Sequence, residues 1–156
     1  RHALALLGRR AHDHDLRAVL GYPVALESRA IRGHDDDGWD AEQTATVAEW
    51  CAKRGADLFD ISSGGLVTGV NIPTGPGYQV PLAESAKAAT GSTVAAVGQI
   101  TSGKQAEEIL QHGLVDVILA GREFLRDPFF GLRAAHELGE SVSWPVQYSR
   151  GQWPNS

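Results

Sequence analysis

The sequence predicts an α/β fold in which about four parallel strands alternate with helices on the outer face, as in half of a TIM (β/α)8 barrel. Apolar runs typical of buried strands begin near positions 23, 57, 94 and 115. Segments with helical spacing separate them, which indicates a parallel sheet with right-handed crossovers. Four strands in 156 residues are half of the eight that a barrel of about 250 residues contains. A small open doubly wound domain is the alternative, although neither GxGxxG nor GxxxxGK(S/T) occurs.

The composition is that of an ordinary globular domain, with 42% hydrophobic residues, 21% charged residues and a net charge of −5. This mild acidity, without a Lys or Arg cluster, argues against a nucleic-acid-binding surface. No apolar run approaches the roughly 18 residues of a membrane span, and no signal peptide is visible. The single cysteine, Cys51, fits a reducing cytoplasm. Because methionine is absent even at position 1, we expect a fragment of a longer protein.

The first 38 residues have the weakest pattern. Pro23–Ser28 (PVALES) predicts the first strand, although Glu27 suits a buried strand poorly. The alternating His and Asp residues at 12–15 are zinc or manganese ligand types, but no second ligand cluster lies nearby, and a solvated helix end is favoured. The acidic segment 34–38 lacks the spacing and final Glu of a calcium loop. We therefore predict no metal site.

The next predicted element is a helix. Asp40 is suited to cap it, and the helix runs over Ala41–Lys53 with Val47, Trp50 and Cys51 as its apolar side. Gly55 follows its end, where a glycine terminates a helix readily.

A strand and a long loop come next. The strand Asp57–Ile61 (DLFDI) runs into Ser62-Ser63-Gly64-Gly65, and small residues at a strand end are typical of the active-site edge of a barrel. The loop 71–79 (NIPTGPGYQ) is rich in Pro and Gly and is of the kind that carries binding groups. The following helix is expected over Val80–Thr90.

Residues 94–130 carry the clearest pattern. Val94–Val97 is a buried strand that stops at Gly98. Thr101 or Ser102 can cap the next helix, and Gly113 ends it. The apolar residues of this helix recur at helical spacing and are Ala106, Ile109 and Leu110.

A second buried strand, Val115–Ala120, closes on Gly121-Arg122. Two consecutive parallel strands therefore end at the same edge of the sheet, at Gly98 and Gly121. Backbone N–H groups without side-chain cover, together with one arginine, suit a phosphate. In (β/α)8 barrels, the loops after the last two strands hold phosphate at this place.

The C-terminal part begins with Pro128, which predicts the start of a final helix through Leu138. The tail Ser143–Trp153 (SWPVQYSRGQW) contains two tryptophans and a tyrosine but no periodicity. Such residues are favoured at interfaces, so we expect the tail to dock on a surface.

Five segments together resemble the C-terminal half of the Old Yellow Enzyme family, and most of all its thermophilic-type bacterial branch of FMN-dependent ene-reductases, NADPH dehydrogenases and xenobiotic reductases. The resemblance covers roughly Trp39–Trp153, whereas residues 1–38 match poorly or have diverged. It implies one partial TIM-barrel domain over residues 1–156. The segments are DLFDISSGG, IPTGPGYQVPLAE, AAVGQITSGKQAEEIL, VDVILAGREFLRDPFF and PVQYSRGQW.

The resemblance implies a cytoplasmic enzyme that binds FMN, oxidises NADPH or NADH, and delivers hydride to the β-carbon of an activated alkene. Gly98, Gly121 and Arg122 fall where the family holds the FMN phosphate, and Ser63 falls at a strand end beside the cofactor. Arg150 matches an arginine that reaches a neighbouring subunit's active site, so a homo-oligomer through the tail is implied.

The sequence also departs from the family. An arginine that contacts the flavin ring has no exact counterpart, because Arg29 is displaced by one or two positions and Glu27 intrudes. Gln152 interrupts the tail motif. The proton-donating tyrosine and the pair that binds the substrate carbonyl belong to the family's N-terminal half, so no catalytic residue is named.

Because those groups are missing, we expect the fragment to be inactive alone. Two alternatives stay open. One is a non-catalytic half-barrel that binds phosphate or a partner half. The other is a different phosphate-binding barrel enzyme.

Overall fold

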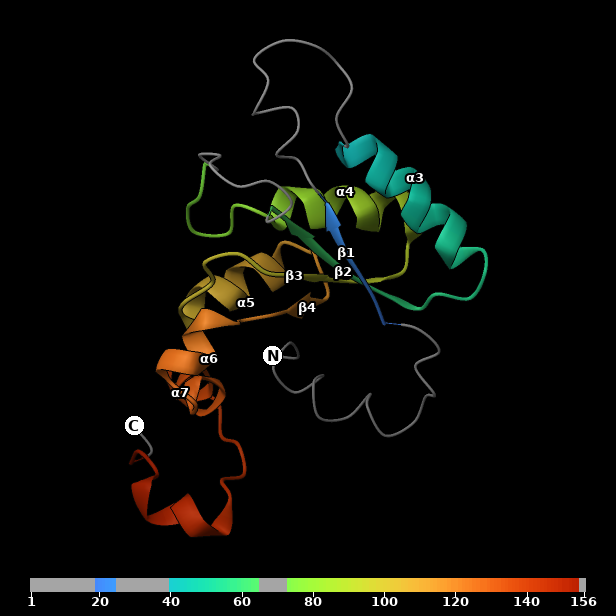
Figure 1. Cartoon of the computed structure of the whole chain (residues 1–156). Coiled ribbons are helices and arrows are strands. Elements are labelled where there is room, and N and C mark those ends of the chain that lie inside the picture. Colours follow the sequence, from blue (N-terminus) through green and yellow to red (C-terminus); the bar gives the residue numbers. More distant parts are fainter. Residues whose placement is uncertain (1–18, 25–39, 65–72, 155–156) are drawn as a thin grey trace.

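The computed structural model describes residues 19–24, 40–64 and 73–154. In these segments strands alternate with helices, and the chain then continues through α6, α7 and η1 towards its C-terminus (Figure 1). The elements are β1 Val19–Val24, α3 Ala41–Ala52, β2 Leu58–Ser63, α4 Val80–Thr90, β3 Thr93–Ala96, α5 Gly103–Gln111, β4 Val117–Ile118, α6 Arg122–Arg126, α7 Phe130–Glu137 and the 3-10 helix η1 Val146–Gly151.

The strands form one parallel sheet in the order β1-β2-β3-β4. The expected α/β class with a parallel sheet is therefore confirmed. Each strand pairs with the next one along the chain, and right-handed crossovers in this order would place the connecting helices on one face.

Local sequence signals explain where the helices begin. Asp40 accepts a hydrogen bond from the Gln43 amide at 2.8 Å, and the Gln43 side chain accepts one from the Asp40 amide at 2.9 Å, which completes a capping box before α3. Ser102, one of the two predicted caps, accepts from the Gln105 amide at 3.2 Å and begins α5. The predicted bounds of α4 are confirmed.

The core lies between the sheet and the helices of the βα units. Phe59 and Ile61 alternate along β2 with half-buried residues, so one face of the strand is apolar. Small residues let α4 pack closely on β2 and β3, since Ala83 and Ala86 are fully buried. The other buried members of the cluster are Ala48, Ala56, Val80, Val94, Ala96, Ile100, Ala106 and Val115.

Two predictions for the first elements are wrong in detail. The first strand was expected at Pro23–Ser28, but β1 spans Val19–Val24, and residues 25–28 lie outside the described part of the chain. Pro23 is tolerated because β1 is an edge strand of the described sheet. In α3 the buried face is Thr44 and Ala48, four residues apart, whereas Trp50 is 55% exposed.

The elements around the second Gly turn also differ from the prediction. β4 is shorter than predicted at both ends. Just before it, the Asp116 amide donates to the Val94 carbonyl at 2.9 Å, and the Asp116 carboxylate accepts a hydrogen bond from the Val94 amide at 3.0 Å. Helix α7 begins at Phe130 and not at Pro128. The Asp127 carboxylate accepts from the Phe129 amide at 3.0 Å, so the intervening residues form a turn.

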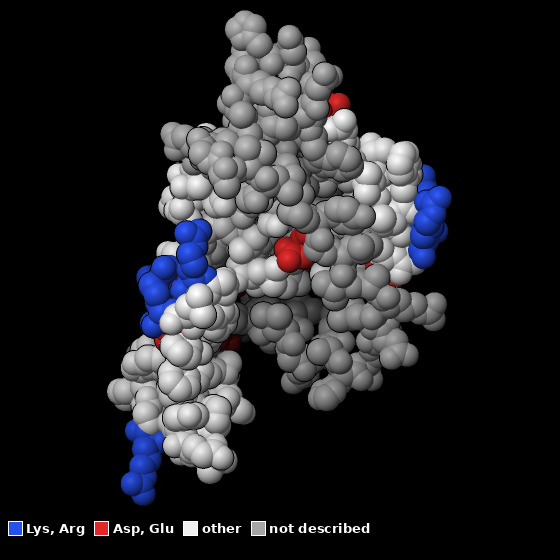
Figure 2. All heavy atoms as spheres, viewed as in Figure 1, with Lys and Arg blue, Asp and Glu red and all other residues white. Residues whose placement is uncertain are grey.

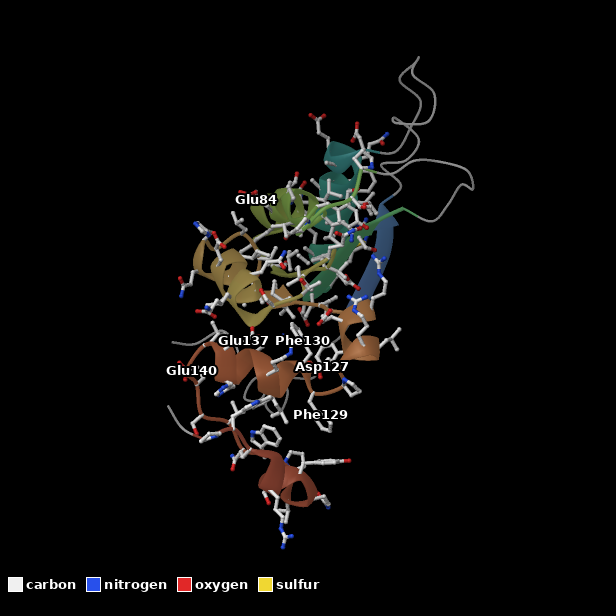
Figure 3. All side chains as sticks on the ribbon, turned by 90° about the vertical axis from the view of Figure 1, so that its left-hand side faces the viewer. Glu84, Asp127, Phe129, Phe130, Glu137 and Glu140 are labelled. Carbon is white, nitrogen blue, oxygen red and sulfur yellow. The ribbon has the colours of Figure 1, made fainter. Side chains whose placement is uncertain are left out.

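Helices α5 and α7 pack at unusually close range. A Cβ on Gly103 would lie 2.7 Å from the Ala134 Cα atom, closer than real contacts allow. Beyond α7 the tail runs away from the sheet, below α7 in both views (Figures 1 and 3). Trp153 stacks on His136 with ring centroids 4.9 Å apart, and Tyr148 meets Phe129 edge-on at 5.0 Å. The tail therefore contacts α7 and the turn before it.

Candidate functional site

The register of the sheet brings the predicted site residues to one edge. Ile61 pairs with Ala96, so two residues further along each strand are Ser63 and Gly98. Ala96 in turn pairs with Ile118, three residues before Gly121. Because parallel strands end at a common edge, Ser63, Gly98 and Gly121 lie along the carboxyl edge of β2, β3 and β4.

Gly98 is required by the backbone and by its neighbours. It is buried with φ +123°, a conformation that other residues rarely adopt. A Cβ here would lie 3.0 Å from Gln79 Nε2 and 3.0 Å from a ring carbon of Tyr78. The Gly98 carbonyl accepts a hydrogen bond from the Gly77 amide at 2.8 Å. The Pro- and Gly-rich loop is thereby fastened to the end of β3.

Gln79 is the residue that sequence reasoning missed at this edge. Its side chain is buried, and its Oε1 accepts hydrogen bonds from the amide and, at 2.9 Å, from the hydroxyl of Ser63. Its Nε2 donates to the Val97 carbonyl at 3.3 Å. Gln79 therefore ties the end of β2 to the end of β3. A polar residue directly before the apolar start of α4 was the available signal.

The end of β4 is open by comparison. Gly121 has φ −85°, which any residue can adopt, and a Cβ there would meet no atom within 4 Å. Arg122 is exposed, and its guanidinium has no polar partner within the described segments. The amides of Gly98, Gly121 and Arg122 likewise donate to none of the described residues. This edge thus offers several unused donors and one unpaired positive charge.

Positive side chains gather near this end of the molecule. Figure 2 shows Lys and Arg on the side where Figure 1 draws α5 and α6. The candidate cation for a bound anion is Arg122, because Arg126 already pairs with Glu123 at 2.8 Å. An anion with several oxygens could accept hydrogen bonds from the strand-end amides and from Arg122 together.

Asp60 is an unexplained polar residue in the sheet. It alternates on β2 with the buried Phe59 and Ile61, so it points to the face opposite those residues. One carboxylate oxygen is buried without a hydrogen-bond partner in the described residues. Burial raises the pKa of Asp60 above its ordinary 3.8, because desolvation disfavours the charged form.

Arg150 is not brought together with the other predicted site residues. It lies in η1, exposed, beyond α7 and away from the sheet (Figure 1). Ser63 does lie at the edge, but Gln79 already occupies its amide and hydroxyl protons. The predicted site residues therefore differ in their hydrogen-bonding roles. Gly98, Gly121 and Arg122 have free donors, whereas Ser63 can only accept.

The described residues contain neither a metal site nor a membrane-spanning helix. The described residues contain no cluster of three or more His, Cys, Asp or Glu that could hold a metal ion, and the His-Asp run at 12–15 lies outside them. Among the described helices, none has the length and apolar character needed to cross a membrane.

Comparison with known proteins agrees with the resemblance seen in the sequence. The pattern of the NADH:flavin oxidoreductase / NADH oxidase family matches residues 21–141. The chain is 50% identical over 113 residues to an NADPH dehydrogenase of Bacillus pumilus, covering 72% of this chain and 33% of that protein. It is 47% identical over 118 residues to the Bacillus subtilis NADPH dehydrogenase, covering 76% and 35%.

A third relative, from Halalkalibacterium halodurans, is also an NADPH dehydrogenase, 48% identical over 136 residues, which are 87% of this chain and 40% of that protein. The chain thus spans about a third to two fifths of the length of these relatives. With more than half of its residues inside the matched pattern, the chain belongs to the NADH:flavin oxidoreductase / NADH oxidase family, as its resemblance to the Old Yellow Enzymes implied.

Proposed function

We propose that this chain holds the phosphate of FMN in an FMN-dependent ene-reductase that oxidises NADPH or NADH. The family implies FMN and a nicotinamide reductant. One observation supports the assignment: the amides of Gly98, Gly121 and Arg122 and the guanidinium of Arg122, all without a partner in the described residues, belong to the segments that follow the carboxyl ends of β3 and β4.

The residues present fit the phosphate end of FMN. A phosphate offers only acceptors, and the free groups here are only donors. Gly121 leaves room above the backbone, since a Cβ there would meet nothing within 4 Å. No contact among the described residues explains why this position is glycine, whereas close approach of a ligand to the backbone would.

Ser63 takes a different role in this proposal. Its amide and hydroxyl protons both go to Gln79, so its oxygen is left as an acceptor. An acceptor suits a hydroxyl of the ribityl chain and not the phosphate. When bound, the flavin supplies hydride transfer to the β-carbon of an activated alkene, while this part of the protein binds and orients it.

We propose further that residues 1–156 are the C-terminal half of one TIM-barrel domain, so that the remaining strands complete the site. Arg150 and the exposed aromatic residues of the tail would then face a second copy of the chain. Val146 and Tyr148 are 85% and 51% exposed, in keeping with an interface. The proposed substrate is a small activated alkene in the cytoplasm.

The phosphate assignment is tested by comparing FMN with riboflavin, which lacks the phosphate. Affinities of the 156-residue chain are measured by amide chemical-shift titration up to millimolar ligand, because a few phosphate hydrogen bonds are largely offset by the cost of association. FMN should bind about tenfold or more tightly than riboflavin, as expected for a charged hydrogen bond of about 1.5–3 kcal/mol.

Arg122→Ala should remove most of that difference, because only the backbone amides then remain for the phosphate, and Arg122→Lys should restore part of it, because Lys offers a point charge and no planar fork. Arg54→Ala, in the turn just after α3, is the matched control and should leave both affinities unchanged. Equal affinities for FMN and riboflavin in the unmodified chain would contradict the proposed function.

A further inference from the structure

Helix α6 carries Arg122 at its first position but has few contacts of its own. It has five residues, none of them buried, and Gly121 before it provides no side-chain cap. Isolated helices shorter than about 12–15 residues are marginal in water. Contacts from outside α6 must therefore determine where Arg122 lies.

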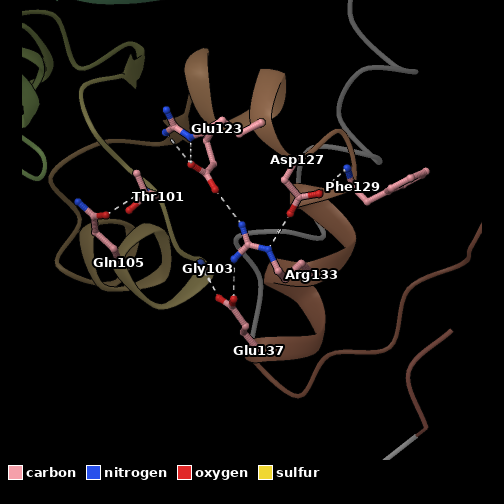
Figure 4. Close-up of polar contacts among 9 residues, drawn as sticks. Thr101, Gly103, Gln105, Glu123, Asp127, Phe129, Arg133 and Glu137 are labelled. Atoms are coloured by element: carbon pink, nitrogen blue, oxygen red, sulfur yellow. Dashed lines mark hydrogen bonds and ion pairs between the residues drawn. The ribbon is translucent and has the colours of Figure 1, made fainter. Parts of the chain in front are cut away.

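Phe124 of α6 packs edge-on against Phe130 of α7, and the polar contacts of the segment converge on Arg133 of α7 (Figure 4). Its guanidinium donates to Glu123 at 2.9 Å, to Asp127 at 2.7 Å and to Glu137 at 2.8 Å. We call these four residues the Arg133 cluster. Glu123 belongs to α6 and Asp127 follows its last residue, so one side chain holds both ends of the short helix.

The other side of the Arg133 cluster rests on a rigid support. The second oxygen of Glu137 accepts a hydrogen bond from the Gly103 amide, at the first residue of α5, at 3.0 Å. Gly103 itself packs against Ala134 without room for a Cβ. Arg133 also lies over the Phe130 ring, 5.1 Å from its centroid. Arg133 therefore connects the α5–α7 pair to the loop and helix that carry Arg122.

The Arg133 cluster is partly shielded from water, so its ion pairs can hold α6 in place. The Glu123 side chain is 13% exposed, and both of its oxygens are engaged, one by Arg133 and the other by Arg126. Without Arg133, three carboxylates close to the phosphate site would have one arginine between them. The resulting excess of negative charge would also disfavour binding of a dianion at Arg122.

We propose that Arg133 is a positioning residue for the phosphate site: it fixes α6, and through α6 the guanidinium of Arg122, in the orientation that receives an anion. The inference rests on the proposed function. Arg122 has no partner in the described residues and is free to bind the phosphate, whereas Arg133 has three partners and contacts no ligand itself.

The test is a double-mutant cycle read as the ratio of riboflavin to FMN dissociation constants for the 156-residue chain. Arg133→Met should lower this ratio about fivefold or more, while the riboflavin constant itself stays unchanged. In the Arg122→Ala background the same substitution should have no further effect, because Arg133 acts through Arg122. Arg133→Lys, which keeps the charge without the fork, should fall between the two.

Lys53→Met is the matched control, since it breaks an exposed ion pair with Glu49 on α3, and it should leave the ratio unchanged. An unchanged ratio in both Arg133→Met and Arg133→Lys would overturn the inference while the effect of Arg122→Ala still supports the proposed function. If Arg133→Met fails to fold, Arg133→Lys alone decides. A ratio of one in the unmodified chain, with no effect of Arg122→Ala, would overturn both.

Discussion

The two glycines that end β3 and β4 occupy similar positions on the sheet edge but different surroundings. Gly98 is buried, has a positive φ and leaves no space for a side chain. Gly121 is exposed, has an ordinary φ and faces open space in the described structure. The contacts of the described residues explain why position 98 is glycine, but they do not explain why position 121 is glycine.

The forces that hold the two strand ends also differ. Neutral hydrogen bonds tie the end of β3 to the end of β2 in a buried setting, since the Gln79 side chain donates to Val97 and accepts from Ser63. Charged contacts of the Arg133 cluster hold the segment after β4, and that segment is largely exposed. The stability of the end of β3 should therefore depend on the size and shape of its side chains. The stability of the segment after β4 should depend on pH and salt concentration.

The largest expected effect is that of a side chain on Gly98. Gly98→Val should lower the free energy of unfolding by about 2–4 kcal/mol, because it adds backbone strain and a clash with Tyr78 and Gln79. Chemical denaturation measures this. Gly121→Ala is the matched control, with a change of less than about 0.5 kcal/mol. Equal effects at the two glycines would break the contrast between the strand ends.

Gln79→Leu comes next in size. The substitution leaves the Ser63 amide and the Val97 carbonyl without their partner, so we expect a loss of about 1–3 kcal/mol in the free energy of unfolding. Hydrogen exchange should become faster at Ser63 but not at the amides of α7. Gln99→Leu, one residue after Gly98, removes a half-buried amide of the same type without this bridge. If Gln79→Leu is as stable as the unmodified chain, the hydrogen bonds of Gln79 do not stabilise the fold.

Asp60→Asn should stabilise the protein at neutral pH by about 0.5 kcal/mol or less, because it removes a charge that is only partly desolvated and is still screened by water. Because the pKa of Asp60 is raised in the folded state, ionisation opposes folding. This penalty is absent well below pH 3.8, grows as the pH rises above it and is complete above the folded pKa. Thermal unfolding at pH 3 and pH 7 checks the difference, which should vanish in acid.

The smallest expected effect is a difference between the two strand ends in how their local stability depends on pH. A hydrogen bond from Arg133 lowers the pKa of Asp127 below 3.8, so this ion pair stabilises the fold above that value and is lost as the pH falls through the folded pKa. Once the pH is well below 3.8, protection from hydrogen exchange should be lost around residues 127–130 while the amides near Gln79 stay protected. Uniform loss of protection would contradict the assignment of charged contacts to the segment after β4.

The sequence predicted the end of β3 to within one residue, because glycine after a buried run is a local signal, whereas β4 ends at Ile118 and not at Ala120. Gly98 and Gly121 were found in this way, and the caps Asp40 and Ser102 follow from equally local chemistry. The contacts of Gln79 and Arg133 were not predicted, since each joins segments that only the fold brings together. Gln79 reaches back 16 residues to Ser63, and Glu137 reaches back 34 residues to Gly103.

Trp50 shows a different limit. Its apolar character suggested a buried face, but the helix rotation that buries Thr44 and Ala48 turns Trp50 outwards. Small residues allowed close packing there, and hydrophobicity alone does not reveal this. The first strand was also misplaced, since it was predicted to begin at Pro23 whereas β1 spans Val19–Val24.

The most direct test of the phosphate site is a titration of the ¹⁵N-labelled chain with FMN, followed residue by residue. Saturable shifts should concentrate at the amides of Gly98, Gly121 and Arg122, and riboflavin should fail to produce them. Amides of η1 around Arg150 should not move. Shifts confined to η1, with the three edge amides unchanged, would contradict the assignment of the phosphate to the carboxyl edge of β3 and β4.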